Sequence, residues 1–215
     1  MNSLNLDQYV KSFAFESKIR KANYAEKSHH ANNLWDKLIS GLNQRDIEFA
    51  VEARKFAATI NYRHPGLEPA EYFLHPLRVG SLGGLINSEN KLISAQVGLL
   101  HNIYEVTDLD RSEIVDSFGP TVDSVLSKLT INRKRQSDTE YLGNYYDEIA
   151  ALPQNLGIIK VLDKIDNLYL LNVTASPTIK EKYLHEVDEY LRPLCEKVAP
   201  YLSNTLNKII EHVRY

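Results

Sequence analysis

The sequence has a single cysteine, Cys195, among its 215 residues. One thiol excludes an internal disulfide and a zinc site built on cysteine ligands. Cys195 lies between apolar neighbours, so we expect it to pack inside a helix and take no part in chemistry. The chain also lacks any apolar run approaching the roughly 18 residues that a membrane-spanning helix needs.

The net charge is also small, because 25 basic and 28 acidic side chains leave a formal charge of only −3. A nucleic-acid-binding surface normally carries a basic excess, so we expect no DNA or RNA partner, although a small polyanion in a local pocket remains compatible. The start of the chain shows no charged leader followed by an apolar core. We therefore expect a cytoplasmic protein with no membrane partner. The pattern does not reveal its oligomeric state.

Glycine and proline are few, at 9 and 8 residues, and no alternating strand pattern ends in a hairpin dipeptide. Apolar residues instead recur every three or four positions, which predicts an all-α fold. Two helical pieces are expected within the first 40 residues, and residues 63–71 and 133–139 are expected to be loops. The remaining helices are predicted at about 43–62, 72–83, 92–107, 110–118, 120–130, 141–152, 156–172 and 179–215, the last interrupted near Pro200.

The predicted helix 156–172 is apolar on both faces, which indicates that it is buried, yet Asp163 projects from the middle of one apolar face. Asn167 follows one turn later, nearly in line with it. A buried carboxylate costs several kcal/mol unless it is paired, hydrogen-bonded or bound to a metal. Two interpretations stay open: a core aspartate satisfied by Lys160, by Lys164 or by helix caps, or a metal ligand.

Two histidines lie in similarly apolar surroundings. His101 and Glu105 are four residues apart and share one helix face, with Asn102 at its edge, and His75 lies within YFLHPLRVG. A lone histidine on an apolar helix is more often a packed core residue. Two histidines and Asp163 on three apolar helices are instead typical of a metal site in a helical bundle, suited to Mn, Fe or Zn.

Several motifs follow one another in a recognisable order: ARKFA at 53–57, Arg63 with Gly66, YFLHPLRVG at 72–80, GLLHNIYEVT at 98–107, FG at 118–119 and KVLDKIDNL at 160–168. Together they resemble the HD-domain hydrolases of the RelA/SpoT type over roughly residues 43–172. Small stand-alone members of that group remove the 3′-pyrophosphate from ppGpp and pppGpp. The resemblance implies an HD-type helical bundle at 43–175. Residues 1–42 would be a helical extension packed on it, and 176–215 would complete the same domain.

The resemblance also implies a manganese ion and assigns roles to residues. His75, His101 and Asp163 would hold the ion, and Asn102 would occupy a weakened fourth ligand position. Glu105 would act as the catalytic acid or base, with Asn102 beside it in the catalytic set. For the nucleotide, the resemblance implies contacts from Arg63 and Asn167.

Other candidates for substrate contacts come from charge and position alone. They are Lys160, Lys164 and the basic triplet 133–135 for phosphates, and Tyr141 for the base. The alternatives are lysines that extend to solvent at the rim of a buried helix, a solvated basic loop, and tyrosine packing.

Two positions depart from the family pattern, because its HD and ED pairs read HN at 101–102 and EV at 105–106. Asn102 offers a neutral carbonyl oxygen, a weaker ligand than a carboxylate, and Val106 removes a second acid. The prediction is a metal-dependent phosphohydrolase whose activity is reduced or altered. The alternative is a catalytically silent HD domain that binds a guanine nucleotide or a protein partner.

Overall fold

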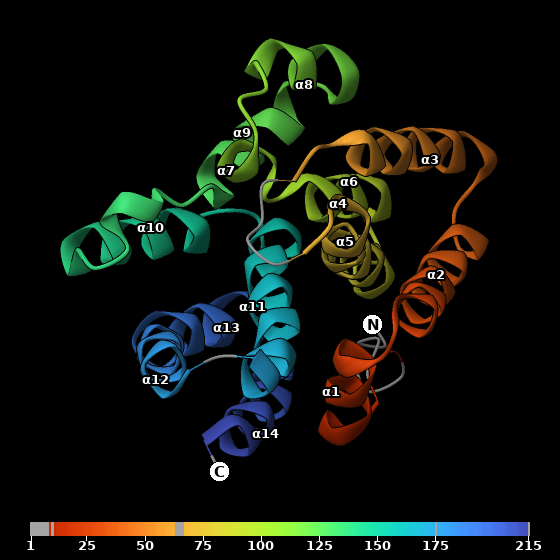
Figure 1. Ribbon diagram of the computed structural model, residues 1–215. Helices are drawn as coiled ribbons and strands as arrows, with labels where there is room; N and C mark the ends of the chain where they lie inside the picture. Colours follow the sequence, from red (N-terminus) through yellow and green to blue (C-terminus); the bar gives the residue numbers. More distant parts are fainter. Residues whose placement is uncertain (1–8, 10, 63–66, 175, 215) are drawn as a thin grey trace.

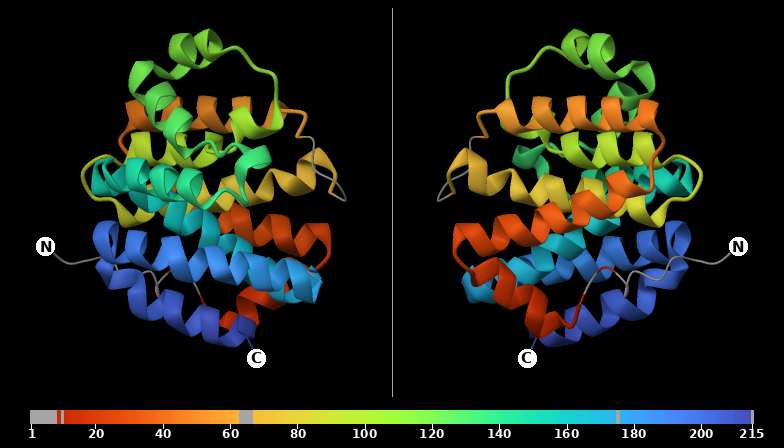
Figure 2. Two further views of the ribbon diagram at one scale, coloured as in Figure 1. Left: turned by 90° about the vertical axis from the view of Figure 1, so that its left-hand side faces the viewer. Right: turned by 90° about the vertical axis from the view of Figure 1, so that its right-hand side faces the viewer.

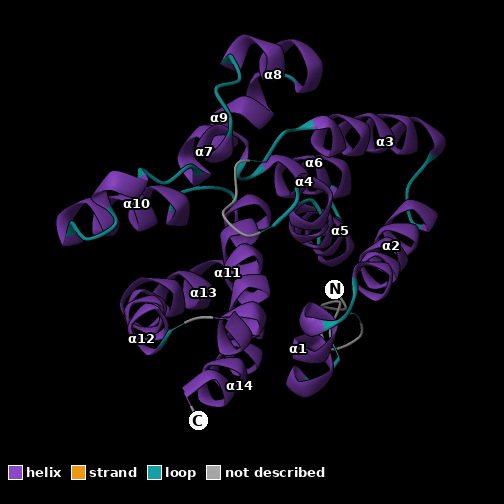
Figure 3. Cartoon of the chain, in the orientation of Figure 1, coloured by secondary structure: helices purple, strands orange, loops and turns teal. Residues whose placement is uncertain are grey.

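The computed structural model describes residues 9, 11–62, 67–174 and 176–214. Throughout this part of the chain the regular elements are helices, and no strand occurs among them (Figure 3). The all-α prediction is therefore confirmed. The longer helices are α1 (Phe13–Lys21), α2 (Tyr24–Ser40), α3 (Gln44–Thr59), α5 (Leu74–Ile86), α6 (Lys91–Leu100), α8 (Arg111–Phe118), α9 (Pro120–Leu129), α10 (Thr139–Ala150), α11 (Gln154–Thr174), α12 (Pro177–Glu186) and α14 (Ser203–Arg214).

Short helical turns connect these helices. They are α4 (Pro69–Tyr72), α7 (Ile103–Val106), the 3-10 turns at Arg133–Arg135 and Pro200–Leu202, the π-helical turn Val187–Leu191 and α13 (Arg192–Val198). The interruption predicted near Pro200 is present as one of these turns. The loops expected at 63–71 and 133–139 are partly helical, because Pro69 takes the first position of α4 and residues 133–135 close a 3-10 turn.

Side chains fix where several helices begin. Ser12, Asn23 and Asn43 precede α1, α2 and α3, and each accepts a hydrogen bond from a backbone N–H of the first turn. Such caps satisfy N–H groups that have no partner within the helix. The capped starts divide the polar N-terminal stretch into two helices, as the sequence predicted.

Helix α11 lies at the centre of the molecule in Figure 1, with α5 and α6 on one side, α12 and α13 on the other, and α14 below it. In the two side views of Figure 2 the C-terminal helices lie in the lower half of the molecule, next to the N-terminal helices. The buried apolar residues of α11, such as Leu162, belong to one hydrophobic cluster that also includes Trp35 of α2 and Ile210 of α14. The terminal helices thus share the core that surrounds α11.

Helices α5 and α6 cross very closely, and this contact positions the two histidines. A Cβ atom added to Gly98 would lie 2.6 Å from the Cα of Gly80, nearer than real Cβ atoms approach. We predicted that the helix carrying His75 would end near Gly83 and Gly84, which is wrong. Instead, α5 continues through both glycines, since their missing side chains make room for Ile159 and Leu38.

The helix predicted over 92–107 is also divided. Helix α6 ends at Leu100, and after the two residues His101 and Asn102 the short helix α7 begins. No glycine or proline marks this break.

The described part of the chain contains no helix with the length and hydrophobicity needed to span a lipid bilayer.

Candidate functional site

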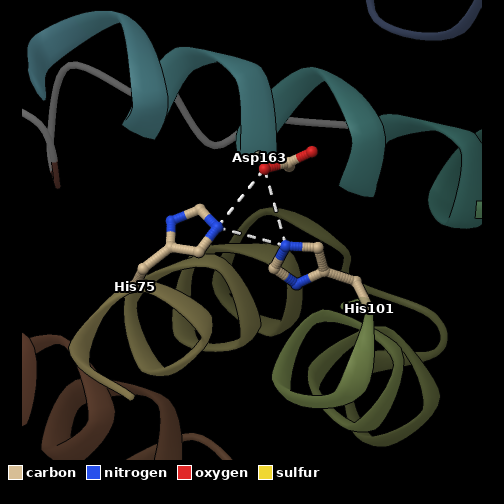
Figure 4. A group of neighbouring side chains, drawn as sticks. All are labelled: His75, His101 and Asp163. Atoms are coloured by element: carbon tan, nitrogen blue, oxygen red, sulfur yellow. Dashed lines mark hydrogen bonds and ion pairs between the residues drawn. The ribbon is translucent and has the colours of Figure 1, made fainter. Parts of the chain in front are cut away.

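Three side chains from three helices meet below the middle of α11 (Figure 4). His75 comes from the first turn of α5, His101 directly follows α6, and Asp163 points from α11 toward both rings. The two Nε2 atoms lie 3.2 Å apart, and Oδ1 of Asp163 lies 3.3 Å from Nε2 of His75 and 3.5 Å from Nε2 of His101. The structure therefore brings together the three residues that the sequence nominated as metal ligands.

Both imidazoles are oriented by hydrogen bonds at the opposite nitrogen. Nδ1 of His101 lies 2.7 Å from the carbonyl oxygen of Gly98, and Nδ1 of His75 lies 2.8 Å from Oδ2 of Asp166. A carbonyl and an ionised carboxylate only accept, so each Nδ1 must carry the proton and donate it. The Nε2 lone pairs then face one another and Oδ1 of Asp163.

Such a triangle of electron-pair donors suits a divalent cation. Ligand atoms that surround such an ion at about 2.0–2.2 Å lie roughly 2.8–3.6 Å from one another at octahedral or tetrahedral angles. The observed separations of 3.2, 3.3 and 3.5 Å lie within that range. Two imidazoles and one carboxylate fit a transition-type ion, and three protein ligands leave coordination positions for water or substrate.

Asp163 divides its two oxygens between different partners. Oδ2 accepts a hydrogen bond from Nζ of Lys160 at 3.0 Å, while Oδ1 faces the histidines and accepts from Nδ2 of Asn167 at 2.8 Å. Burial by itself raises the pKa of Asp163, but Lys160 and the two histidines outweigh it and hold that pKa well below its usual range. The core ion pair considered as an alternative thus exists, and it leaves Oδ1 directed toward the candidate metal position.

Sequence reasoning missed Asp166, one turn from Asp163 on α11. Only 3% of its surface is exposed, and its carboxylate accepts from Nδ1 of His75, from Nε and Nη2 of Arg78 at 2.8 Å each, and from Arg20 of α1. Burial raises the pKa of Asp166, but Arg20 and Arg78 outweigh it and hold the pKa well below the ordinary value. The available signal was the one used for Asp163: an ionisable residue on a helix that is apolar all round.

The pKa of His75 is also shifted. Burial lowers it, but hydrogen bonds to Asp163 and Asp166 and the charges of both carboxylates raise it by more. The pKa of Tyr72 is raised to about 12, first by burial and then by the charges of Asp163 and Glu105. Without an ion the cluster therefore favours a second proton on His75, at Nε2 beside Asp163, and a neutral phenol at Tyr72. A lone pair on Nε2 becomes available to an ion when that proton leaves.

Asn102 and Glu105 lie near this cluster without joining its triangle. Nδ2 of Asn102 donates a hydrogen bond of 2.9 Å to the hydroxyl of Tyr72. Glu105 accepts from the backbone N–H of Ile131 at 3.2 Å and pairs with Nη2 of Arg133 at 3.3 Å. The carboxylate of Glu105 is thus held at the wall of the site by the segment that follows α9.

A cavity of about 370 Å³ opens beside the cluster. More cationic than anionic side chains line it, and Asn102 and Asn167 contribute amides. Lys164 reaches Oε1 of Glu186 at 2.7 Å and is buried, so it does not extend to solvent as the alternative interpretation proposed. The charged lining residues are Arg20, Lys27, Glu71, Arg78, Glu105, Arg133, Lys160, Asp163, Lys164 and Asp166.

The remaining candidates are placed less favourably. Tyr141 does not line this cavity; its hydroxyl accepts from the N–H of Asn132 at 2.6 Å, and the guanidinium of Arg135 lies over its ring. This arrangement matches the packing alternative. Of the basic triplet only Arg133 reaches the cavity, and Arg63 lies outside the described residues.

The fold is an HD-type helical bundle. A solved structure with this fold matches with a TM-score of 0.59 over 80% of this chain and 96% of its own, at 22% identity. That structure is of a metazoan ortholog of SpoT, which is described as hydrolysing ppGpp and playing a role in starvation responses.

A curated relative is similar in sequence as well. The guanosine-3′,5′-bis(diphosphate) 3′-pyrophosphohydrolase of Aquifex aeolicus (strain VF5) is 29% identical over 168 residues. The match covers 76% of this chain, which spans only about a quarter of the relative's length, 23%. No family model matches the chain.

Proposed function

We propose that this protein is a metal-dependent phosphohydrolase that removes pyrophosphate from the 3′ position of guanosine 3′,5′-bis(diphosphate), with Mn²⁺ as its ion. The observation that carries the proposal is the triangle of His75, His101 and Asp163 beside a cavity with a cationic lining. The two relatives support the substrate, because each is described as acting on ppGpp.

The protein's own residues supply the binding of the ion and of the phosphates. The Nε2 atoms of His75 and His101 and Oδ1 of Asp163 would hold the ion, which when bound supplies Lewis-acid stabilisation and activates water for attack on phosphorus. Lys160 and Lys164, both buried beside the cavity, provide positive charge for a diphosphate. Asn167 fixes Asp163 through its hydrogen bond.

Glu105 is the group placed to move a proton. Its charge acts on both Tyr72 and Lys160, and it lines the same cavity as Asp163. In the proposed reaction water attacks the phosphorus attached to the 3′ oxygen. The bond between that oxygen and phosphorus breaks, and GDP and pyrophosphate leave. Glu105 would take the proton from water or return one to the 3′ oxygen.

A second candidate function follows from Asn102. Its amide nitrogen is engaged by Tyr72, and the residue brings no negative charge to the metal position. This favours a silent domain that binds the nucleotide without hydrolysing it.

One assay separates the two candidates. The purified chain is incubated with ppGpp and Mn²⁺, products are separated by ion exchange, and ppGpp affinity is measured by calorimetry with and without chelator. GDP and pyrophosphate in equal amounts support the enzyme. Binding without turnover selects the silent domain, and neither binding nor turnover contradicts both.

A further inference from the structure

Asp166 accepts hydrogen bonds from two arginines, Arg20 and Arg78, and from the imidazole of His75. Each of its oxygens accepts two hydrogen bonds: Oδ1 from Arg20 and from Nε of Arg78, Oδ2 from Nη2 of Arg78 and from Nδ1 of His75. The side chain is 4% exposed, so these protein donors replace water. A buried carboxylate with four donors is held in one position.

We propose that Asp166 is a positioning residue: it holds His75 as the Nδ1–H tautomer with Nε2 directed at the ion, and Arg20 and Arg78 hold Asp166 in place. The inference rests on the ion site of the proposed function, and it adds residues that the sequence did not nominate. A carboxylate that accepts from the far nitrogen of a metal-binding histidine fixes the ring and increases its basicity as a ligand.

The geometry favours this role over a purely structural ion pair. Arg78 alone could neutralise Asp166, since it forms the bidentate fork at 2.8 Å and 2.8 Å. His75 nevertheless takes the remaining position on Oδ2, also at 2.8 Å, and among the described residues its Nδ1 has no other hydrogen-bond acceptor. His101 is oriented differently, by the carbonyl of Gly98. The two rings therefore depend on different supports, and only one should respond to Asp166.

Arg20 brings the N-terminal helix α1 into the site. Its guanidinium bridges Glu16 of α1 and Asp166 of α11, lies over the ring of Tyr169 and lines the cavity. Both Glu16 and Arg20 are buried. The N-terminal extension thus contributes a charged side chain to the support of His75.

The first test measures ion binding and ring tautomer on the full chain. Asp166→Asn is expected to weaken Co²⁺ or Mn²⁺ binding between about tenfold and about hundredfold, the usual effect of losing such a partner. In wild type at alkaline pH, nitrogen-15 NMR of the His75 ring should show the proton on Nδ1. In Asp166→Asn the ring should become a mixture of tautomers, while His101 stays unchanged.

Two further variants separate positioning from folding. Asp123→Asn breaks another carboxylate–arginine fork, with Arg111 and Tyr104, and should leave ion affinity and His75 unaltered. The double variant Asp166→Asn with Arg20→Met removes one guanidinium that the single variant strands. It should recover stability toward urea without recovering ion affinity.

The outcomes distinguish this inference from the function it extends. Unchanged ion affinity and an unchanged His75 tautomer in Asp166→Asn would overturn the positioning role. Wild type that binds no divalent ion would overturn the ion site, and the NMR measurement would still decide whether Asp166 fixes His75. Neither ion affinity nor the NMR measurement uses ppGpp. Failure of the hydrolase assay would therefore contradict neither the ion site nor the positioning role of Asp166.

Discussion

The ammonium group of Lys160 lies 3.0 Å from Oδ2 of Asp163, and both side chains are almost fully buried. The pKa of Lys160 is raised well above its ordinary value: burial lowers it, but neighbouring groups, with Tyr145 and Asp163 the largest, outweigh that effect. This pair neutralises the carboxylate before any ion binds. A lysine so close to the candidate metal ligand Asp163 stabilises the metal-free state and would oppose a cation at that position.

Lys160→Met separates these two effects. Removing one partner of a buried pair costs about 3–5 kcal/mol, so we expect the metal-free variant to unfold at much lower urea concentration. Mn²⁺ should then restore more stability in the variant than it adds to wild type. Lys164→Met is the matched control, because Lys164 pairs with Glu186 and its loss should not change the stabilisation by Mn²⁺. Equal responses of both variants would contradict the role assigned to Lys160.

Asn102→Asp should strengthen metal binding and hydrolysis. A carboxylate beside His101 adds negative charge at the candidate fourth position, and the hydroxyl of Tyr72 can donate to it in place of the present amide contact. We expect at least about a tenfold gain in Mn²⁺ affinity by calorimetry. The exposed Asn204→Asp on α14 adds the same charge outside the cavity and should have no effect. If Asn102→Asp changes neither quantity, Asn102 does not reach the ion.

Glu105→Gln should lower turnover and leave ion binding nearly unchanged. General acid–base groups contribute about 10²–10⁴-fold to rate, and glutamine cannot exchange a proton. The amide is close in size and still accepts from the N–H of Ile131. Turnover of ppGpp and Mn²⁺ affinity are measured in parallel, with the exposed Glu140→Gln as control. A variant that keeps full turnover would remove Glu105 from the mechanism.

The stability of the metal-free protein should pass through a maximum on the acid side of neutrality. The pKa of His75 is raised in the folded state, so its stabilisation is complete below about 6.5 and is lost as pH rises through the raised pKa. The pKa values of Asp163 and Asp166 are lowered, so their stabilisation is present above about 4 and is lost as pH falls.

Urea unfolding with chelator at several pH values tests this prediction. We expect the highest free energy of unfolding between about pH 4 and about pH 6.5. Metal binding must displace the proton of His75, so Mn²⁺ affinity should rise with pH over the range in which chelated protein loses stability. Stability that increases steadily from acid to alkaline pH would contradict the linkage.

Two glycine substitutions should have opposite effects on stability, one at the crossing of α5 and α6 and one on α10. In Gly98→Ala the new Cβ would meet the backbone of Gly80, so we expect a loss of about 1–3 kcal/mol in unfolding free energy and weaker ion binding. In Gly143→Ala on α10 nothing lies within 4 Å of the new atom. This variant should gain about 0.5–1 kcal/mol, because alanine favours a helix interior. Urea midpoints of both variants check the contrast.

The sequence predicted the convergence of three polar side chains better than it predicted helix ends. His75, His101 and Asp163 stood out because each interrupts an apolar helical pattern, and burial of an ionisable group requires a partner. The break after Leu100 carries no such mark, because no glycine or proline lies at residues 99–106. The helix end predicted near Gly83 is wrong, because this glycine has an ordinary helical conformation. Its missing side chain allows close packing against Ile159.

The support of His75 was predictable in part. Asp166 and Arg78 both lie on predicted helices with apolar surroundings, within the motifs at 160–168 and 72–80. Like Asp163, each is an ionisable residue that needs a partner when buried, so a buried pair was predictable. Arg20 could not be found in this way, because it belongs to a polar segment and meets Asp166 only when α1 packs on α11. Local pattern identifies a buried charge, but only the tertiary structure identifies a partner 146 residues away.

The distance in sequence between these residues determines when the site can form. The ion pair between Arg20 and Asp166 connects the end of α1 with the middle of α11, so every helix from α2 to α10 lies between them in sequence. A chain emerging from the ribosome cannot assemble the triangle until α11 has left the exit tunnel, even though both histidines appear much earlier. The triangle of His75, His101 and Asp163 therefore cannot close before Asp163 is synthesised, and translation products that end before α11 lack it.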